Sequence, residues 1–156
     1  MLHSFGDRTD DGRGPQASLI YVNGAFYGTT ADGGERTMAG RSCKAEGCGT
    51  VYRISRSGVE HAIYRFRLRP DAAHPVGGLL YVKDMFYGTT DYGGSYGRGA
   101  IFQVTMLGRE TVLHAFSGKP DGANPMSALT DVNGALYGTT PGGGSNNIGT
   151  IFRINP

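Results

Sequence analysis

The sequence has no tryptophan, only two cysteines and no long hydrophobic run. No apolar stretch approaches the ~18 residues that a membrane span needs, so we expect no membrane insertion. The net charge is only +2, with 15 basic and 13 acidic residues spread along the chain, which leaves no basic stripe for nucleic acid. No segment keeps a helical period over about ten residues. These absences argue against a helical, a membrane-inserted and a nucleic-acid-binding protein.

Glycine and tyrosine are instead abundant, with 27 and 9 residues among 156. Tyrosine favours strands and glycine allows tight turns, so the composition predicts many short strands. The length fits one domain of ordinary size, and we expect residues 1–156 to form a single soluble domain. The first residues do not contain a charged region followed by an apolar core, as a secretion signal would.

One motif, Tyr-Gly-Thr-Thr, occurs three times, beginning at Tyr27, Tyr87 and Tyr137. In each copy a proline stands twelve residues before the tyrosine and an aspartate four before the proline, while a glycine pair and a strand-like run follow. The chain is therefore three copies of one unit, with boundaries at 1–57, 58–107 and 108–156. The first copy has ten extra residues between the glycine pair and the run, which places an insertion at about residues 35–48.

Each copy contains four candidate strands, which in the second copy are 79–82, 85–90, 100–105 and 111–116. Two residues join the first pair of strands, Asn-Gly in the first and third copies and Lys83-Asp84 in the second. Asn-Gly supplies the positive φ angles of a type I′ hairpin. Four antiparallel strands in about 50 residues match one blade of a β-propeller.

The two ends of the chain hold parts of incomplete blades. The opening Leu2–Phe5 matches the fourth strand, and the closing Phe152–Ile154 is a third strand with no fourth after it. Three blades are too few for a ring, since propellers have roughly four to eight. We therefore expect an all-β homodimer, in which two chains meet head to tail and complete a six-bladed propeller. The alternative is a β-trefoil, which also uses three four-stranded repeats and would close as a monomer.

The combined motifs resemble the GloVer tandem-repeat family, named for Gloeobacter and Verrucomicrobia. The resemblance is carried by Tyr-Gly-Thr-Thr, the glycine pair, Gly-Thr-Val/Ile-Phe/Tyr, Leu-His-x-Phe and Asp-Gly-x-x-Pro, and it covers the chain apart from the insertion. It implies a part of a secreted or surface-anchored bacterial protein, and it brings no catalytic residues with it. The second copy departs from the pattern at Ala72 and at Lys83-Asp84.

In a propeller the aspartate loops and the glycine-pair loops would emerge on one face, which makes that face the expected ligand site. The ligand-binding candidates there are Asp11, Arg13, Asp71, His74, Tyr92, Tyr96, Asp121, Asn124, Arg41 and Lys44. The three aspartates recur at the same place in every copy, and we expect each to cap its turn by accepting backbone N–H groups, with ligand contact as the alternative.

Residues that differ between copies are better candidates for chemistry. His74 replaces Gly14 and Asn124 at the equivalent position, Asp91 begins the glycine-pair loop of the second copy, and Asp32 precedes the glycine pair of the first. Asp32, Asp91 and His74 are therefore the catalytic candidates, because carboxylate and imidazole groups can transfer protons or bind a sugar hydroxyl. The alternative is that these side chains are merely solvated at the surface.

Both cysteines, Cys43 and Cys48, lie in the insertion, and we expect them to form a local disulfide in an oxidising compartment. The chain lacks Cys-x-x-Cys and His-Glu-x-x-His spacing, so no metal site is expected, and no cofactor either.

Two functions remain open. The first is a secreted or cell-surface domain that binds a glycan or another surface ligand through the loop face. The second is a glycoside hydrolase or a polysaccharide lyase with its active site at the pore mouth, which is an analogy with other propellers. A purely structural repeat is the third reading.

Overall fold

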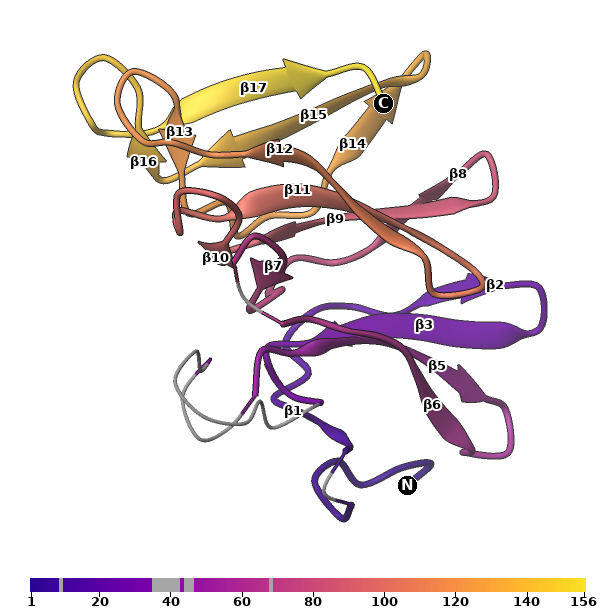
Figure 1. Cartoon of the computed structure of the whole chain (residues 1–156). Coiled ribbons are helices and arrows are strands. Elements are labelled where there is room, and N and C mark those ends of the chain that lie inside the picture. The colour runs from indigo at the N-terminus through magenta and orange to yellow at the C-terminus, as the bar shows by residue number, and fades with distance from the viewer. Residues whose placement is uncertain (9, 35–42, 44–46, 68) are drawn as a thin grey trace.

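The computed structural model describes residues 1–8, 10–34, 43, 47–67 and 69–156, and every regular element within these ranges is a β-strand. Three antiparallel sheets follow one another along the chain and lie side by side, from the N-terminal repeat to the C-terminal one (Figure 1). The part of the chain that is described holds no helix that could cross a membrane.

Each sheet is built from strands consecutive in sequence. The first sheet contains β2 (Ile20–Val22), β3 (Ala25–Thr30), β5 (Thr50–Ser55) and β6 (Glu60–Arg65). The second sheet contains β8 (Leu80–Val82), β9 (Met85–Thr90), β11 (Ala100–Thr105) and β12 (Glu110–Ala115). The third sheet has only three strands, β14 (Thr130–Val132), β15 (Ala135–Thr140) and β17 (Thr150–Ile154). The sequence pattern thus located the long strands to within a residue in the second copy.

The hairpin turns have the conformation that the sequence predicts. Asn23 and Gly24 have φ angles of 47° and 84°, and Lys83 and Asp84 have 49° and 62°. Two consecutive positive φ angles are the mark of a type I′ turn. The prediction is confirmed, and the second copy adopts the same turn without glycine.

Three short ladders were not predicted. They join β1 (Gly12–Arg13) to β4 (Asp32–Gly33), β7 (Ala72–Ala73) to β10 (Tyr92–Gly93), and β13 (Gly122–Ala123) to β16 (Gly142–Gly143). Each pairs the aspartate loop of a repeat with its glycine-pair loop. Strands of two residues leave no periodic pattern in a sequence, which is why only the long strands could be identified.

The expected opening strand, Leu2–Phe5, is not a strand in the structure. A β-strand needs a hydrogen-bonding neighbour, and no strand in the described part of the chain pairs with this segment. Phe5 still packs on Tyr52 with ring centroids 5.0 Å apart, and Phe66, which follows β6 of the first sheet, packs on Phe102 of the second sheet at the same distance. The segment therefore occupies the place of a fourth strand without its pairing.

The core lies between successive sheets. Val51 and Tyr27 of the first sheet share one buried cluster with Phe86 of the second, and the rings of Tyr27 and Phe86 lie 4.5 Å apart. A second cluster joins Ile101 of the second sheet to Leu136 of the third. Each sheet thus buries the apolar residues of one face against the next sheet, as repeat proteins do.

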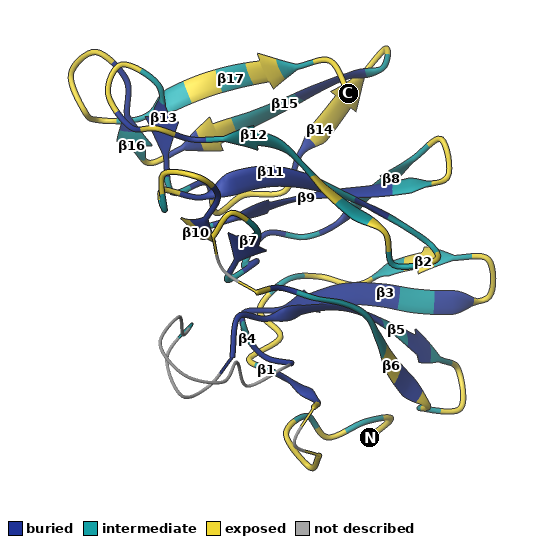
Figure 2. Ribbon diagram, viewed as in Figure 1, coloured by how far each residue is buried: buried dark blue, intermediate teal, exposed yellow. Residues whose placement is uncertain are grey.

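Burial falls off at the two ends of the row of sheets. Val51 and Ile101 have 0% and 1% of their surface exposed, but the equivalent Ile151 in the third sheet is 83% exposed. At the other end, Leu19 is 48% exposed, whereas its counterparts Leu79 and Leu129 are each 5% exposed. Figure 2 shows the same contrast between the buried strands of the first two sheets and the exposed parts of β14, β15 and β17.

The glycine of the repeated motif leaves room for an aromatic ring from the paired strand. A methyl group added at Gly88 would come within 2.5 Å of the Phe102 ring. We predict that Gly88→Ala lowers the free energy of unfolding by about 1–3 kcal/mol, because the core is overpacked. Urea unfolding measures it. In the control, Gly78→Ala, the added methyl would have its nearest neighbour 3.7 Å away, so little change is expected. Equal effects of the two variants would contradict this packing.

Candidate functional site

The aspartate loops and the glycine-pair loops gather on one side of the row of sheets. The three short ladders that join them lie together in Figure 1, opposite the hairpin turns of the long strands. We call this side the loop face. It is defined by the residues of the ladders β1–β4, β7–β10 and β13–β16 and the loops that continue from them. The arrangement agrees with the expectation that both kinds of loop share one face.

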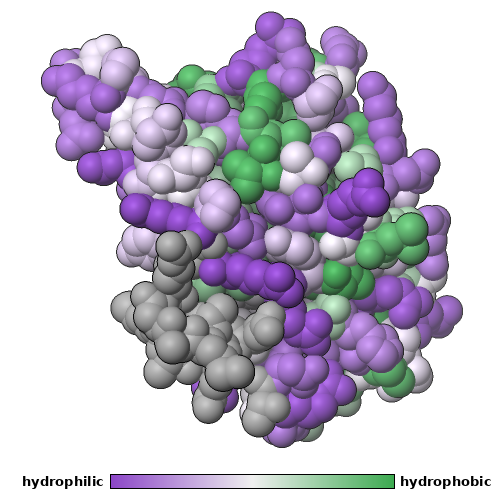
Figure 3. All heavy atoms as spheres, in the orientation of Figure 1, coloured by the Kyte–Doolittle hydropathy of each residue, from purple (hydrophilic) through white to green (hydrophobic). Residues whose placement is uncertain are grey.

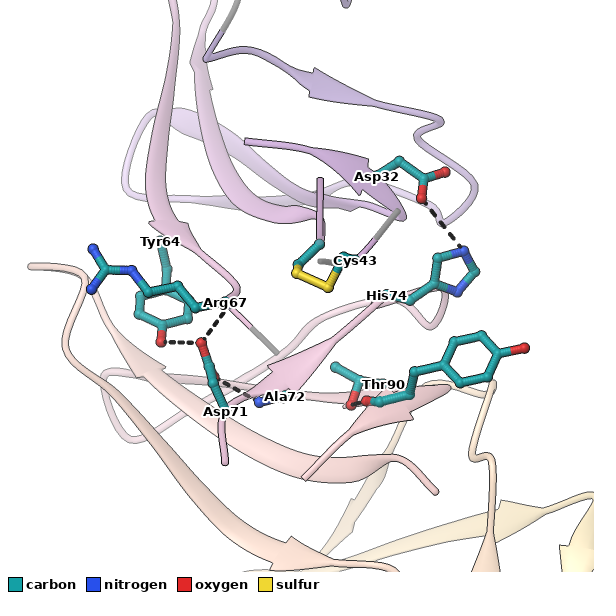
Figure 4. The surroundings of a disulfide bond; sticks show 10 residues. Asp32, Cys43, Tyr64, Arg67, Asp71, Ala72, His74 and Thr90 are labelled. Carbon is teal, nitrogen blue, oxygen red and sulfur yellow. Dashed lines mark hydrogen bonds and ion pairs between the residues drawn. A yellow bond between two sulfur atoms is a disulfide. The ribbon is translucent and has the colours of Figure 1, made fainter. Parts of the chain in front are cut away.

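The three catalytic candidates meet on the loop face. His74 Nε2 lies 3.9 Å from Asp32 Oδ1 (Figure 4), and His74 Nδ1 lies 3.8 Å from Asp91 Oδ2. The ring of Tyr92 lies beside the imidazole, with centroids 5.6 Å apart. Asp32 comes from the first repeat and the other three residues from the second, so the cluster joins two repeats. We call these four residues the His74 cluster.

The backbone holds His74 in place. Its φ angle is 61°, in the left-handed region that few residues other than glycine adopt and in which Asn, Asp and His are the most frequent exceptions. The His74 N–H donates to the carbonyl of Cys48 at 2.8 Å, and its own carbonyl accepts from the Asp91 N–H at 3.1 Å. Cys48 forms a disulfide with Cys43, and Figure 4 shows this bond close to the strand that leads to His74. The disulfide loop therefore supports the position of the imidazole.

The cluster has capacity for a polar ligand. His74 Nδ1 is buried and makes no hydrogen bond to the described residues. Burial raises the pKa of the Asp91 carboxyl, against the opposing effects of Asn124 and the His74 imidazole. Tyr92 and Tyr96 of the same loop are 51% and 59% exposed. The cluster thus combines carboxylates and an imidazole with exposed aromatic rings.

The recurring aspartates cap their turns. Asp71 accepts hydrogen bonds from the backbone N–H groups of Arg67 at 2.8 Å and Ala72 at 2.7 Å. Asp11 accepts from Gly6 and Gly12, each at 2.9 Å. Asp121 follows the same pattern, accepting from Ser117 N–H at 3.0 Å. These bonds confirm the expected capping, and a further role in ligand binding stays a prediction.

The other candidates are spread over the loop face. Asn124 donates from Nδ2 to the carbonyl of Asp91 at 2.9 Å, which ties the third repeat to the His74 cluster. Arg13 stands opposite Asp32 in the β1–β4 ladder. The carbonyl of Tyr96 accepts from Arg69 at 3.0 Å. Arg41 and Lys44 lie outside the described residues.

A groove of about 740 Å³ was not expected from the sequence. It runs along β12 and is lined by Tyr64, Arg67, Asp71, Glu110 and His114, among others. Tyr64 donates its hydroxyl to Asp71 Oδ2 at 2.8 Å, and Glu110 Oε1 is buried with no hydrogen bond in the described part of the chain. One feature of the sequence pointed to this groove. Glu60 and Glu110 occupy equivalent positions, each eleven residues after the glycine that precedes the third strand (Gly49 and Gly99).

Burial sets the electrostatics of the groove. It raises the pKa of Glu110 to about 7, and the Asp71 carboxylate adds to the rise. Burial also raises the pKa of Asp71 and of the Tyr64 hydroxyl. A carboxyl that titrates near neutral pH in a groove can donate and accept a proton, which is the property of a general acid or base.

The comparisons with known proteins give a family for the chain. The model of the Gloeobacter/Verrucomicrobia repeat matches residues 37–156. A search of curated proteins gives no significant match. The family match agrees with the repeat motifs, and it assigns no ligand or reaction.

The raised pKa of Glu110 predicts a pH dependence of stability. A carboxyl with a higher pKa in the folded state holds its proton more tightly when folded. The protonated Glu110 therefore contributes its full stabilisation below the unfolded pKa of about 4.5. This contribution to the free energy of unfolding is lost as the pH rises through about 7. Glu110→Gln should therefore unfold at a higher temperature than the unaltered protein at pH 8.5, with the difference shrinking toward pH 4.

Thermal unfolding followed by circular dichroism across this pH range measures the effect. The control is Asp7→Asn, which removes an exposed carboxylate instead. Parallel pH profiles for Glu110→Gln and the unaltered protein would show that Glu110 does not titrate in this way.

Proposed function

Because the chain belongs to the Gloeobacter/Verrucomicrobia repeat family, we propose that its sheets are propeller blades and that two copies close head to tail into a six-bladed ring. The loop face of this ring then binds a glycan or another surface ligand through the His74 cluster. The observation that carries ring closure is the exposure of Ile151, since the equivalent Val51 and Ile101 are covered by the next sheet.

The uncovered ends of the row are complementary. The third sheet exposes the face that the first two sheets bury against the sheet after them. The first sheet exposes Leu19 on the face that the other two bury against the sheet before them. A second copy placed with its first sheet on Ile151 would cover both faces at once. Burying an isoleucine or leucine side chain stabilises by about 1.5–3 kcal/mol, so four such residues in two junctions favour association.

A repeated hydrogen bond supports the same register. Thr29 donates from Oγ1 to the carbonyl of Gly77 in the next repeat at 3.2 Å, and Thr89 donates to the carbonyl of Ser127 at 2.8 Å. The third member, Thr139, is exposed and bonds within its own repeat to Ser127 Oγ at 3.1 Å. In the proposed ring, the carbonyl of Ala17 in a second copy would take the place of the Gly77 and Ser127 carbonyls and accept from Thr139.

The ends of the strands repeat the pattern. Phe66 N–H donates to the Gly49 carbonyl, and Phe116 N–H donates to the Gly99 carbonyl, both at 3.0 Å. The corresponding pair is Phe5 and Gly149, which lie at opposite ends of the chain. Pairing Phe5 of one copy with Gly149 of another would give the opening segment the strand neighbour that it lacks. These features favour the propeller over a β-trefoil, because a trefoil would close within one chain.

Oligomeric state tests ring closure. Size-exclusion chromatography with light scattering should give a mass of about 33 kDa, twice the 16.5 kDa of one chain. Ile151→Asp should convert the protein to monomers, because a carboxylate cannot be buried in the junction without a large cost. Leu107→Asp is the control, since Leu107 is 97% exposed and lies in the turn between β11 and β12. A monomeric unaltered protein, or dissociation by both variants alike, would contradict the proposal.

The His74 cluster supports ligand binding on the loop face. Tyrosine rings combine a flat apolar surface with a hydroxyl group, which suits stacking on a sugar. Asp32, Asp91 and His74 can hydrogen-bond to sugar hydroxyls beside the exposed rings of Tyr92 and Tyr96. The Cys43–Cys48 disulfide supports a secreted or cell-surface location, where such ligands occur and disulfides persist.

A glycan array tests the ligand. The unaltered protein should bind a subset of glycans, and His74→Ala and Tyr92→Ala should each reduce binding to them by roughly tenfold or more. The control is His61→Ala, which removes an exposed histidine of β6 away from the cluster. Binding that survives both loop-face substitutions would place the ligand elsewhere.

The groove along β12 favours a second candidate function, hydrolysis or elimination in a polysaccharide. The observation for it is the pKa of about 7 of Glu110 beside a second carboxyl, Asp71. Product release from glycans by the unaltered protein, lost in Glu110→Gln and retained in His74→Ala, would establish this enzyme. Binding without turnover would leave the loop-face ligand site as the function.

A further inference from the structure

Three polar side chains from distant parts of the sequence meet beside the first sheet. His3 comes from the opening segment, Asp11 from the first aspartate loop, and Glu60 from the start of β6. One ligand atom from each lies within 4.8 Å of the other two, and His3 Nε2 lies 3.4 Å from Asp11 Oδ2. Ligand atoms on a tetrahedral zinc ion are about 3.3 Å apart, given metal–ligand bonds of about 2.0–2.2 Å. The His3–Asp11 distance of 3.4 Å matches this spacing, and Glu60 offers a third ligand atom within 4.8 Å of both.

The two carboxylates are buried. The side chain of Asp11 is 0% exposed and that of Glu60 is 1% exposed, while that of His3 is 16% exposed. Arg8 donates to Glu60 Oε2 at 2.8 Å, but Glu60 Oε1 and His3 Nε2 are buried and make no hydrogen bond within the described residues. Burial and the neighbouring Asp11 carboxylate raise the pKa of Glu60. Arg8 pairs with one oxygen of Glu60, and a cation bound at the unpartnered Oε1 would offset the remaining negative charge of the two buried carboxylates.

The Asp11 carboxylate is already oriented. Its oxygens accept from the backbone N–H groups of Gly6 and Gly12, each at 2.9 Å. Hydrogen bonds of this kind fix the direction of a carboxylate ligand and are typical of the groups around bound metals. Oδ2 faces His3, so a lone pair remains available on the side of the cluster.

The equivalent positions beside the other two sheets hold directly hydrogen-bonded pairs. Beside the second sheet the residues are Tyr64, Asp71 and Glu110, and the Tyr64 hydroxyl donates to Asp71 Oδ2 at 2.8 Å. Beside the third sheet, His114 Nε2 lies 3.0 Å from Asp121 Oδ2, within hydrogen-bond distance. His3 Nε2 and Asp11 Oδ2 are farther apart, at 3.4 Å, and a Glu60 carboxylate oxygen lies within 4.8 Å of both.

We infer that His3 Nε2, Asp11 Oδ2 and Glu60 Oε1 bind a divalent transition-metal ion, with water as the fourth ligand. The combination of one imidazole and two carboxylates suits Zn²⁺ better than Ca²⁺ or Mg²⁺, which take oxygen ligands. The ion fastens the opening segment to the first sheet, which holds that segment beside the proposed junction with a second copy. All three ligands belong to one chain, so the site does not depend on ring closure or on a glycan.

Zinc binding to the full-length chain tests the inference. Protein treated with a chelator and dialysed is titrated with ZnCl₂ in a calorimeter, and its thermal unfolding is followed with and without the ion. We expect one ion per chain and a higher unfolding temperature with zinc, because a ligand that binds only the folded state stabilises it. CaCl₂ should produce neither effect at the same concentration.

Two substitutions identify the ligands. His3→Tyr copies the second repeat, so the variant should fold with its own tyrosine–aspartate hydrogen bond, and it should lose affinity for zinc by roughly a hundredfold. Glu60→Gln should weaken binding to a similar degree. The matched control is His114→Tyr, the same change at the equivalent position of the third repeat, which should bind zinc as the unaltered protein does.

Several results would overturn the site. These are no heat and no thermal shift on adding zinc, equal affinity in His3→Tyr and the unaltered protein, or an equal loss in His114→Tyr. The same titration on monomeric Ile151→Asp separates this inference from ring closure, because zinc should bind the monomer with unchanged affinity.

Discussion

The structure depends on the burial of each sheet against the next one. One repeat alone cannot bury the apolar face of its own four-stranded sheet. The neighbouring sheet covers that face. Within each sheet, Gly28 and Gly88 leave room for the rings of Tyr52 and Phe102 on the paired strand, which fill the space where a side chain would stand. The contact between sheets also defines the two ends of the row, where Ile151 and Leu19 have no sheet to cover them.

The loop face follows from this stacking. When successive sheets pack face to face, their loops gather on one side, and residues from two repeats come within reach of each other. Asp32 and His74 are 42 positions apart in the sequence yet meet across such a boundary. The hydrogen bond from His74 to the Cys48 carbonyl crosses the same boundary, so the inserted loop and the cluster are parts of one arrangement. Figure 3 shows a largely hydrophilic surface in this view, with hydrophobic residues in separate small patches.

Much of the fold could be predicted because the repeat spacing fixes the strands. Type I′ turns at Asn23-Gly24 and Lys83-Asp84 and the missing fourth strand after Ile154 were all readable from the sequence. The sequence indicated that Leu2–Phe5 belongs to an incomplete blade, but it did not show that the segment lacks strand structure, because strand propensity is local while strand formation depends on a neighbour. The His74 cluster could be anticipated from residues that differ between copies. Tyr64 and Glu110 were missed because they lie on strands, and their environment is set by distances between sheets. The grouping of His3 with Glu60 has no spacing motif at all.

The central claim is that the third sheet of one copy packs on the first sheet of another. Thiol-specific crosslinking between Ala17→Cys and Thr139→Cys tests it most directly, because the proposed junction would bring these two positions together across copies, as the Thr29–Gly77 and Thr89–Ser127 hydrogen bonds do for their counterparts within one chain. Mixing the two single variants should give a covalent dimer with a short bifunctional reagent, while either variant alone should give none. Crosslinked dimers from one variant alone, or no dimer from the mixture, would contradict head-to-tail closure.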